Sequence, residues 1–92
     1  MRFEWDARKG LANRRKHRIE FTEALTVFSD PLSITISDPD STVEEDRLVT
    51  VGMSGTRRIL VVVHTERGER TRLISARTAT KHERIKYQEN TI

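Results

Sequence analysis

The side chains best suited to chemistry in this sequence are arginines in its C-terminal half. Of the 17 basic residues, 13 are arginine, and a guanidinium group can hold a phosphate through two parallel hydrogen bonds. Together with a few histidines and carboxylates, such cations suit the cleavage of RNA by its own 2′-hydroxyl group, because that reaction needs a proton acceptor, a proton donor and positive charge around the phosphate. Five arginines on or beside the last expected strand and helix are the first candidates: Arg67, Arg70, Arg72, Arg77 and Arg84.

Metal and nucleotide chemistry have no comparable signature here. The chain has no cysteine and only four glycines, so it offers no thiolate metal site and no glycine-rich phosphate loop. The acidic residues between 38 and 46 lack the spacing of a calcium loop. The three histidines are scattered, at His17, His64 and His82. We therefore expect neither a metal ion nor a cofactor.

The composition limits the size of the core. A chain of 92 residues with 35% hydrophobic and 34% charged residues has room for one domain, over residues 1–92, with a thin core. We expect one sheet with helices on one face. The longest apolar run, residues 59–63, is far shorter than the ~20 residues that span a bilayer, and the N-terminus has no apolar signal-peptide segment. These features predict a soluble protein of the cytoplasm.

The charge is unevenly distributed along the chain. Residues 31–46 contain five acidic residues and no basic one, whereas residues 47–92 contain ten basic and four acidic residues. The whole chain has a net charge of +3. An acidic middle beside a basic C-terminal half predicts that one face binds an anionic partner.

Hydrophobic periodicity predicts eight elements in the order β-α-α-β-β-β-β-α. Apolar and polar residues alternate in the expected strands. Successive strands joined by short turns predict an antiparallel sheet of about four to five strands in an α+β fold. The expected helices cover residues 7–17, residues 21 to about 29 and about nine residues after Thr80, and the expected strands cover residues 3–5, 32–37, 47–54, 58–66 and 70–76.

Three local signals predict where these helices begin and end. Asp6 can cap the first helix, because its carboxylate can accept hydrogen bonds from exposed amides of the first turn. Pro31 disfavours helical geometry in the residue before it, so the second helix is expected to end near Asp30. The segment Thr80-Lys81-His82-Glu83 fits the capping box that begins a helix.

Several short strings occur in an order that resembles a known family. They are Phe3-Glu4-Trp5-Asp6, Lys9, Asn13, Lys16-His17, Phe21-x-Glu23-Ala24 and Phe28-x-Asp30-Pro31, followed by Glu45-x-Arg47, Leu60-Val61-Val62-Val63, Thr65-x-Arg67, Arg72-Leu73-Ile74-Ser75-Ala76-Arg77 and Glu83-Arg84-x-x-Tyr87. In this order, from residue 3 to about residue 88, the strings resemble the BrnT family of type II toxins.

The resemblance implies a RelE-like fold and a ribonuclease that arrests growth by cutting RNA. It also implies a partner, an antitoxin similar to BrnA whose ribbon-helix-helix domain binds DNA, so that the toxin meets operator DNA only through the antitoxin. Lys81 and His82 depart from the family pattern, and we expect both to lie away from the site.

Within this resemblance we predict the residues that carry the reaction. Arg67 and Arg77 are expected to stabilise the phosphate and the transition state. His17, Lys16 and Glu45 are candidates for proton transfer or positioning. RNA binding is assigned to four further arginines and to two aromatic side chains that could stack on bases: Arg47, Arg70, Arg72, Arg84, Trp5 and Tyr87.

Each of these residues also has an ordinary structural alternative. An arginine can simply solvate an exposed sheet face, and His17 can compensate the dipole at a helix C-terminus. Trp5 and Tyr87 can belong to the core. For the whole chain, the alternative is a non-catalytic toxin homologue that acts as a binding module or co-repressor with its antitoxin.

Overall fold

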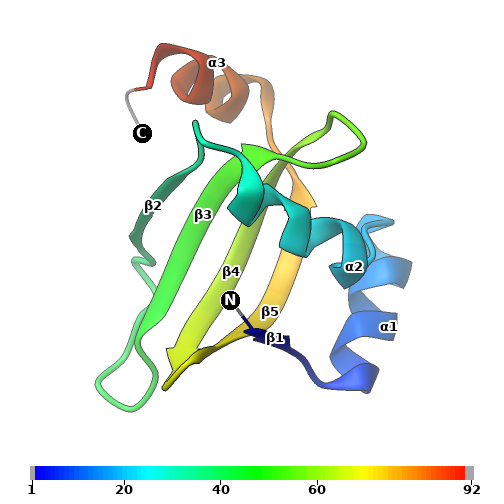
Figure 1. The fold of residues 1–92 in the computed structure, drawn as a ribbon, viewed down its shortest axis with the longest axis vertical. Coiled ribbons are helices and arrows are strands. Elements are labelled where there is room, and N and C mark those ends of the chain that lie inside the picture. The colour runs from blue at the N-terminus through cyan, green and yellow to red at the C-terminus, as the bar shows by residue number, and fades with distance from the viewer. Residues whose placement is uncertain (1, 91–92) are drawn as a thin grey trace.

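The computed structural model describes residues 2–90 as a five-stranded sheet with helices on both of its faces (Figure 1). The predicted α+β class and the predicted element order are confirmed. The elements are β1 (Arg2–Glu4), α1 (Ala7–His17), α2 (Phe21–Ala24), the 3-10 helix η1 (Leu25–Ser29), β2 (Ile34–Ser37), β3 (Arg47–Met53), β4 (Ile59–Arg67), β5 (Arg70–Thr78) and α3 (Lys81–Glu89).

The sheet has the strand order β1-β5-β4-β3-β2, with β4 in its centre. Strands β2 to β5 pair antiparallel, as predicted. Strand β1 instead pairs parallel with β5, from Arg2 opposite Arg70 to Glu4 opposite Arg72. The prediction of a wholly antiparallel sheet is therefore wrong at this edge. The prediction was based on the short turns that join successive strands. Such turns give no information about β1 and β5, which are far apart in the chain.

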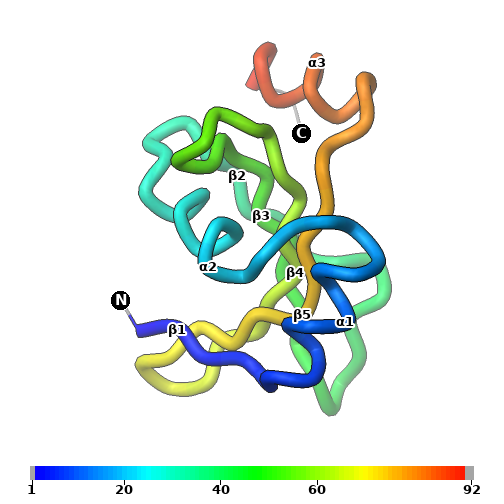
Figure 2. The backbone as a smooth tube through the Cα atoms, turned by 90° about the vertical axis from the view of Figure 1, so that its right-hand side faces the viewer, coloured from blue at the N-terminus to red at the C-terminus, as the bar shows by residue number. Residues whose placement is uncertain are grey.

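One face of the sheet is covered by α1, α2 and η1, and most of the core lies there. Its fully buried side chains come from the helical segments and from the inward positions of β4 and β5: Ile19, Phe21, Ala24, Val27, Leu60, Val62, Leu73 and Ala76. The edge-on view in Figure 2 shows α2 on one side of the strands.

The second helix changes its winding after Ala24. The predicted single helix is an α-helix only over Phe21–Ala24 and continues as the 3-10 helix η1. This tighter segment passes close to β3, where a Cβ atom at Gly52 would lie 3.1 Å from the Val27 carbonyl oxygen. Gly52 is therefore required for the close approach of η1 and β3.

Helix α3 lies over the opposite face, at one end of the sheet. Its only buried side chain is Tyr87, which packs against Val51, Val61 and Ala79. The Tyr87 hydroxyl donates a hydrogen bond to Asp30. The expectation that the helices share one face is therefore wrong, because the packing of Tyr87 against Val51 and Val61 places α3 on the opposite face of the sheet.

The edge of β5 beyond its short pairing with β1 is closed by a side chain. Asn13 in α1 donates from Nδ2 to the Ala76 carbonyl oxygen at 2.8 Å and to the Ile19 carbonyl oxygen at 3.0 Å. The Ala76 amide in turn donates to Asn13 Oδ1 at 2.9 Å. Asn13 thus supplies both hydrogen bonds that a neighbouring strand would give Ala76, and it fixes α1 beside β5.

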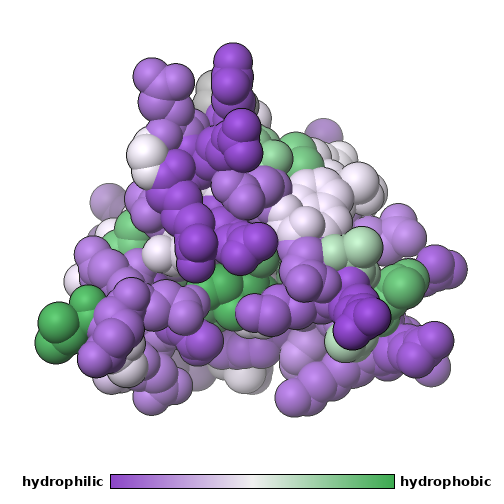
Figure 3. Space-filling model, turned by 90° about the horizontal axis from the view of Figure 1, so that it is seen from below, coloured by the Kyte–Doolittle hydropathy of each residue, from purple (hydrophilic) through white to green (hydrophobic). Residues whose placement is uncertain are grey.

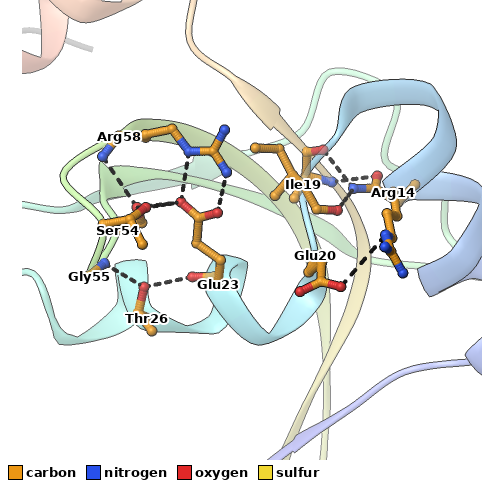
Figure 4. A network of polar contacts seen from close by, with 11 residues as sticks. Arg14, Ile19, Glu20, Glu23, Thr26, Ser54, Gly55 and Arg58 are labelled. Atoms are coloured by element: carbon orange, nitrogen blue, oxygen red, sulfur yellow. Dashed lines mark hydrogen bonds and ion pairs between the residues drawn. The ribbon is translucent and has the colours of Figure 1, made fainter.

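The turn between β3 and β4 is tied to α2 by a polar network (Figure 4). Glu23 accepts hydrogen bonds from the Arg58 guanidinium and from the Ser54 hydroxyl, the latter at 2.7 Å. The Gly55 amide donates to Thr26 Oγ1 at 2.8 Å. The Arg58 guanidinium, as the largest influence, lowers the pKa of Glu23 from 4.5 to about 2. This network holds α2 and η1 against the covered face.

Candidate functional groove

The face opposite the helix-covered core contains a groove of about 670 Å³. The side chains of a strand point alternately to the two faces of a sheet, so alternate residues of β2 to β5 form its floor. One row across the sheet is Ile36, Val49, Val63 and Ser75. Helix α3 covers only one end of this face, which leaves the row accessible.

Arg77 lies beside the apolar floor, in register with Val61 of β4. Its guanidinium donates two hydrogen bonds to the Glu83 carboxylate of α3, at 2.7 and 2.9 Å. Glu83 also accepts from the Thr80 amide at 2.8 Å, and the Thr80 hydroxyl accepts from the Glu83 amide. The predicted capping box is thus confirmed, and the same carboxylate that begins α3 also orients Arg77.

The pairing shifts the pKa values of both side chains. The Arg77 guanidinium, as the largest influence, lowers the pKa of Glu83 from 4.5 to about 2. The Glu83 carboxylate in turn raises the pKa of Arg77. The Arg77 side chain nevertheless remains 41% exposed and lines the groove.

Further polar groups border the groove. Arg47, the first residue of β3, lines the end of the groove away from α3. The Arg47 Nε atom is 3.3 Å from Glu45 Oε1. His82 and Lys86 of α3 line the other end. Three cations, Arg47, Arg77 and Lys86, line the groove together with three carboxylates, Asp38, Asp40 and Glu83. The groove therefore combines an apolar floor, which suits a base, with cations that suit phosphates, and its carboxylates balance the charge of those cations.

The five C-terminal arginines are not gathered around one pocket. Arg67 and Arg70 face each other at the turn between β4 and β5. Arg77 is seven residues farther along β5, roughly 20 Å away at the usual rise of a strand. Arg72 is paired with Glu4, at 3.6 Å. The expectation that Arg67 and Arg77 act together on one phosphate therefore does not fit the structure, because residues close in the sequence are spread along extended strands.

The end of the sheet that carries Arg67 and Arg70 differs from the groove. Seen from below, this end of the molecule is largely hydrophilic, and its hydrophobic side chains do not join into one patch (Figure 3). Arg67, Glu69 and Arg70 are all exposed there. Arginine at this turn has the environment of a solvated surface.

The two large aromatic candidates contribute to packing. Tyr87 is 7% exposed and lies in the small cluster under α3. Burial, followed by its hydrogen bond to Asp30, raises the pKa of its hydroxyl to about 12. Trp5 is half-buried against the core, with its ring edge-on to Phe21 at 5.8 Å between centroids. Tyr87 in particular offers no ring face on which a base could stack.

Arg84 lies on α3 and is exposed. Its guanidinium donates a hydrogen bond to the Ala79 carbonyl oxygen at 3.1 Å. It does not line the groove, which α3 approaches with His82, Glu83 and Lys86 instead.

His17 and Lys16 lie at the end of α1, in a separate hollow of about 260 Å³ at the edge of β5. Lys9, Asn13, Ile74 and Ser75 also line this hollow. Neither His17 nor Lys16 lines the groove itself. Ser75 alone among the hollow's residues also lines the groove, so the two depressions meet at β5.

Several residues that line the groove are not among those predicted from the sequence. His82, expected away from the site, is part of it, and so are Lys86, Ser75, Asp38 and Asp40. The signal was the capping box at Thr80, because a helix that begins four residues after Arg77 must place its first turn beside that arginine. The third histidine, His64, is buried on the opposite face, where its Nε2 atom is 2.7 Å from Thr50 Oγ1.

Within residues 2–90, no three His, Cys, Asp or Glu side chains are grouped so that they could hold a metal ion. No helix in the same range has both the length and the apolar character needed to cross a membrane.

Comparisons with known proteins agree with the fold of the chain. Residues 5–83 match a family model described as the ribonuclease toxin BrnT of type II toxin–antitoxin systems. The crystal structure of the ribonuclease toxin BrnT from Brucella abortus superposes with a TM-score of 0.66 at 26% sequence identity, over 88% of this chain and 99% of that chain. No curated protein matches. Since the family model spans most of the sequence, the chain belongs to the BrnT family of ribonuclease toxins of type II toxin–antitoxin systems.

Proposed function

We propose that this protein is a metal-independent endoribonuclease that cleaves RNA in the groove on the open face of the sheet. The 2′-oxygen of one nucleotide attacks the adjacent phosphorus while the bond from phosphorus to the 5′-oxygen breaks. The proton of the 2′-hydroxyl passes to a base, and a second proton goes to the departing 5′-oxygen. The products are a 2′,3′-cyclic phosphate and a 5′-hydroxyl end.

The position of Arg77 is the observation that carries this proposal. A guanidinium fixed in place by two hydrogen bonds to Glu83 can stabilise the charge that builds on the phosphate without first losing side-chain freedom. Arg47 supplies a second cation at the other end of the same groove. Arg67 remains a candidate only for contacts outside it.

Proton transfer is proposed for the groups nearest these cations. His82 lines the groove, and imidazole can accept and donate a proton near neutral pH. Glu45 is held beside the groove by its ion pair with Arg47. His17 and Lys16 lie one hollow away, which suits binding better than proton transfer.

The test is RNA cleavage by the purified protein in the presence of a metal chelator. We expect 2′,3′-cyclic phosphate ends, and a loss of about 10²–10³-fold in rate for Arg77→Ala, the usual cost of removing one group aimed at developing charge. Arg77→Lys should recover only part of the rate, because an ammonium cannot form the two parallel hydrogen bonds. Arg15→Ala, which removes an exposed charge from α1, is the control for net charge.

A second arginine variant distinguishes an effect of the position of Arg77 from an effect of net charge alone. Arg67→Ala removes the same charge at the end of β4, beside the turn to β5, and we expect its rate to fall less than threefold. A rate for Arg77→Ala equal to that of the parent would contradict the proposal. Because Arg77 also holds α3 through Glu83, unfolding by urea is measured for each variant. Glu83→Gln removes the charge of this ion pair but keeps Arg77, so it shows whether weaker anchoring of α3 alone explains a loss of rate.

We further propose that the antitoxin partner resembles BrnA and carries a ribbon-helix-helix domain that binds operator DNA. The type II family supports an antitoxin partner, and the cations that line the groove, Arg47, Arg77 and Lys86, suit an acidic segment that competes with RNA. Co-purification with the product of the adjacent gene tests this proposal. A complex that still cleaves RNA at the rate of the free toxin would contradict it.

One observation favours a second function. Both arginines of the groove are already paired with carboxylates, Arg77 with Glu83 and Arg47 with Glu45. A toxin homologue that has lost catalysis and acts with its antitoxin as a binding module or co-repressor would have this arrangement. Induction of the toxin without its antitoxin distinguishes the two: arrested growth supports the ribonuclease, and undisturbed growth with folded protein supports the binding module.

A further inference from the structure

We propose that the RNA strand continues from the groove over the free edge of β5, where Lys9, Lys16 and His17 of α1 form a second subsite that binds phosphates of nucleotides beside the cleaved bond. This inference rests on the proposed ribonuclease function and extends it. It assigns the α1 cations to substrate binding and not to the chemical step.

The surface is continuous between the groove and the hollow on α1. Ser75 of β5 lines both the groove and the hollow of about 260 Å³ on α1. Strand β1 pairs with β5 only up to Arg72, so no strand separates the two depressions at Ser75. A chain leaving the groove at this point meets the side chains of α1 next.

The junction between α1 and β5 is held by hydrogen bonds. Two hydrogen bonds of Asn13 join α1 to Ala76, the residue between Ser75 and Arg77, and a third joins it to the Ile19 carbonyl oxygen. Lys9 and Lys16 flank Asn13 on the same side of the helix, four residues before it and three after it. The backbone positions of both lysines are therefore fixed relative to β5, as a binding track for one strand requires.

Helix α1 is strongly basic. Helix α1 contains no acidic residue, and its last turn carries Arg14, Arg15, Lys16 and His17. Within residues 2–90, neither Lys9 nor Lys16 is paired with a carboxylate. The arginines of the groove are paired. The α1 hollow thus offers uncompensated cations, which suit phosphates bound as point charges.

The chemistry of the hollow favours a nucleic-acid strand over a protein segment. Most of the surface that lines it is apolar, but the apolar side chains are only Ala12 and Ile74, whereas the core of a protein interface is dominated by several aromatic and aliphatic anchors. A polyanionic strand needs only spaced cations and a hydroxyl such as that of Ser75. An acidic partner protein on the same surface is the competing outcome of the test.

The test compares two double variants on the same helix. Lys9→Ala/Lys16→Ala removes the cations of the hollow, and Arg8→Ala/Arg15→Ala removes equal charge at the same spacing from exposed positions outside it. The probe is single-stranded RNA of 3 or 12 nucleotides with 2′-O-methyl groups, which lack the proton needed for cleavage. Binding is measured as a function of salt concentration.

We expect Lys9→Ala/Lys16→Ala to weaken binding of the 12-mer about tenfold at low salt, and to reduce the slope of log affinity against log salt by about 1.4, since each phosphate contact on a single strand contributes about 0.7. The 3-mer should lose far less affinity, because it can occupy the groove without reaching α1. The arginine control should change the 12-mer slope by less than half as much.

Three outcomes would overturn the proposal. Equal losses for both double variants would indicate general attraction, and equal losses for the 3-mer and the 12-mer would place the lysines in the reacting site. Unchanged RNA binding together with weaker binding of the antitoxin would assign the surface to a protein partner. If the predicted length dependence is found but the unmodified 12-mer is not cleaved, the subsite stands and the proposed ribonuclease activity fails.

Discussion

The two faces of the sheet differ in what covers them. On one face, α1, α2 and η1 bury a continuous core that includes Leu60 and Val62 of β4. On the other, α3 covers only one end through Tyr87, and the neighbouring Val63 remains half-buried on the floor of a groove. Consecutive residues of β4 thus enter opposite environments.

This difference separates the source of stability from the candidate site. Free energy from apolar burial scales with the area removed from water, so most of it comes from the helix-covered face. The open face keeps apolar surface accessible, at a cost in stability that the covered face offsets. A small domain can carry such a groove only if its other face is well packed and its edges are closed by polar contacts such as those of Asn13.

Loss of the Asn13 side chain should have the largest effect on stability. Asn13→Ala would leave the Ala76 amide, the Ala76 carbonyl and the Ile19 carbonyl without the partner that now satisfies them. Buried groups left in this way cost about 1–3 kcal/mol each, so we expect the free energy of unfolding in urea to fall by about 3 kcal/mol or more. Arg15→Ala, on the exposed side of the same helix, should change it by less than about 0.5 kcal/mol. A small change for Asn13→Ala would show that water replaces the side chain and that this edge is not sealed.

A direct comparison of the two faces uses adjacent residues. Val62→Ala removes two methyl groups from a fully buried position, and we expect it to lower the free energy of unfolding by about 2 kcal/mol, the sum of the lost transfer energy and a small cavity. Val63→Ala removes the same atoms from the half-buried floor of the groove, and the loss should be below about 1 kcal/mol. Equal losses would mean that the open face is packed in solution, for example by self-association.

Local signals predicted the elements well because their causes are local. The N-cap at Asp6 and the capping box at Thr80 are satisfied within a single helical turn, so the sequence nearby contains all the information. The parallel pairing of β1 with β5 joins residues almost 70 positions apart. No spacing rule connects such strands, which is why that edge was predicted incorrectly.

The candidate site was predicted only in part, for a related reason. Arg77 was found because arginine is the expected cation, but its partner Glu83 was read only as a cap. The grouping of Arg67 with Arg77 failed because closeness along a strand is not closeness in space. His82 was missed because its place in the groove depends on the face that α3 covers, and that face is chosen by the packing of Tyr87.

The smallest expected effects concern stability in acid. Each face of the sheet has a glutamate that is paired with an arginine. Glu23 serves the covered face and Glu83 the open one, and each has its pKa lowered from 4.5 to about 2, in each case mainly by an arginine partner. A lowered pKa means that the folded state prefers the charged carboxylate. The stability that each group adds is therefore complete above pH 4.5 and is lost as the pH falls through about 2.

Glu23→Gln and Glu83→Gln should each lower the free energy of unfolding at pH 7 by about 1 kcal/mol or less, because both ion pairs are partly exposed and screened by solvent. Each variant should also lose less stability than the parent between pH 5 and pH 2, since the titrating group has been removed. Glu23→Gln should have the larger effect of the two, because its side chain is only 14% exposed and also accepts from the Ser54 and Thr56 hydroxyls, whereas Glu83 is 29% exposed. Urea unfolding at pH 7 and pH 3 measures both differences. A larger loss for Glu83→Gln would reverse the comparison, because it would make the anchoring of α3 over the groove, and not the helix-covered face, the more sensitive point of the fold in acid.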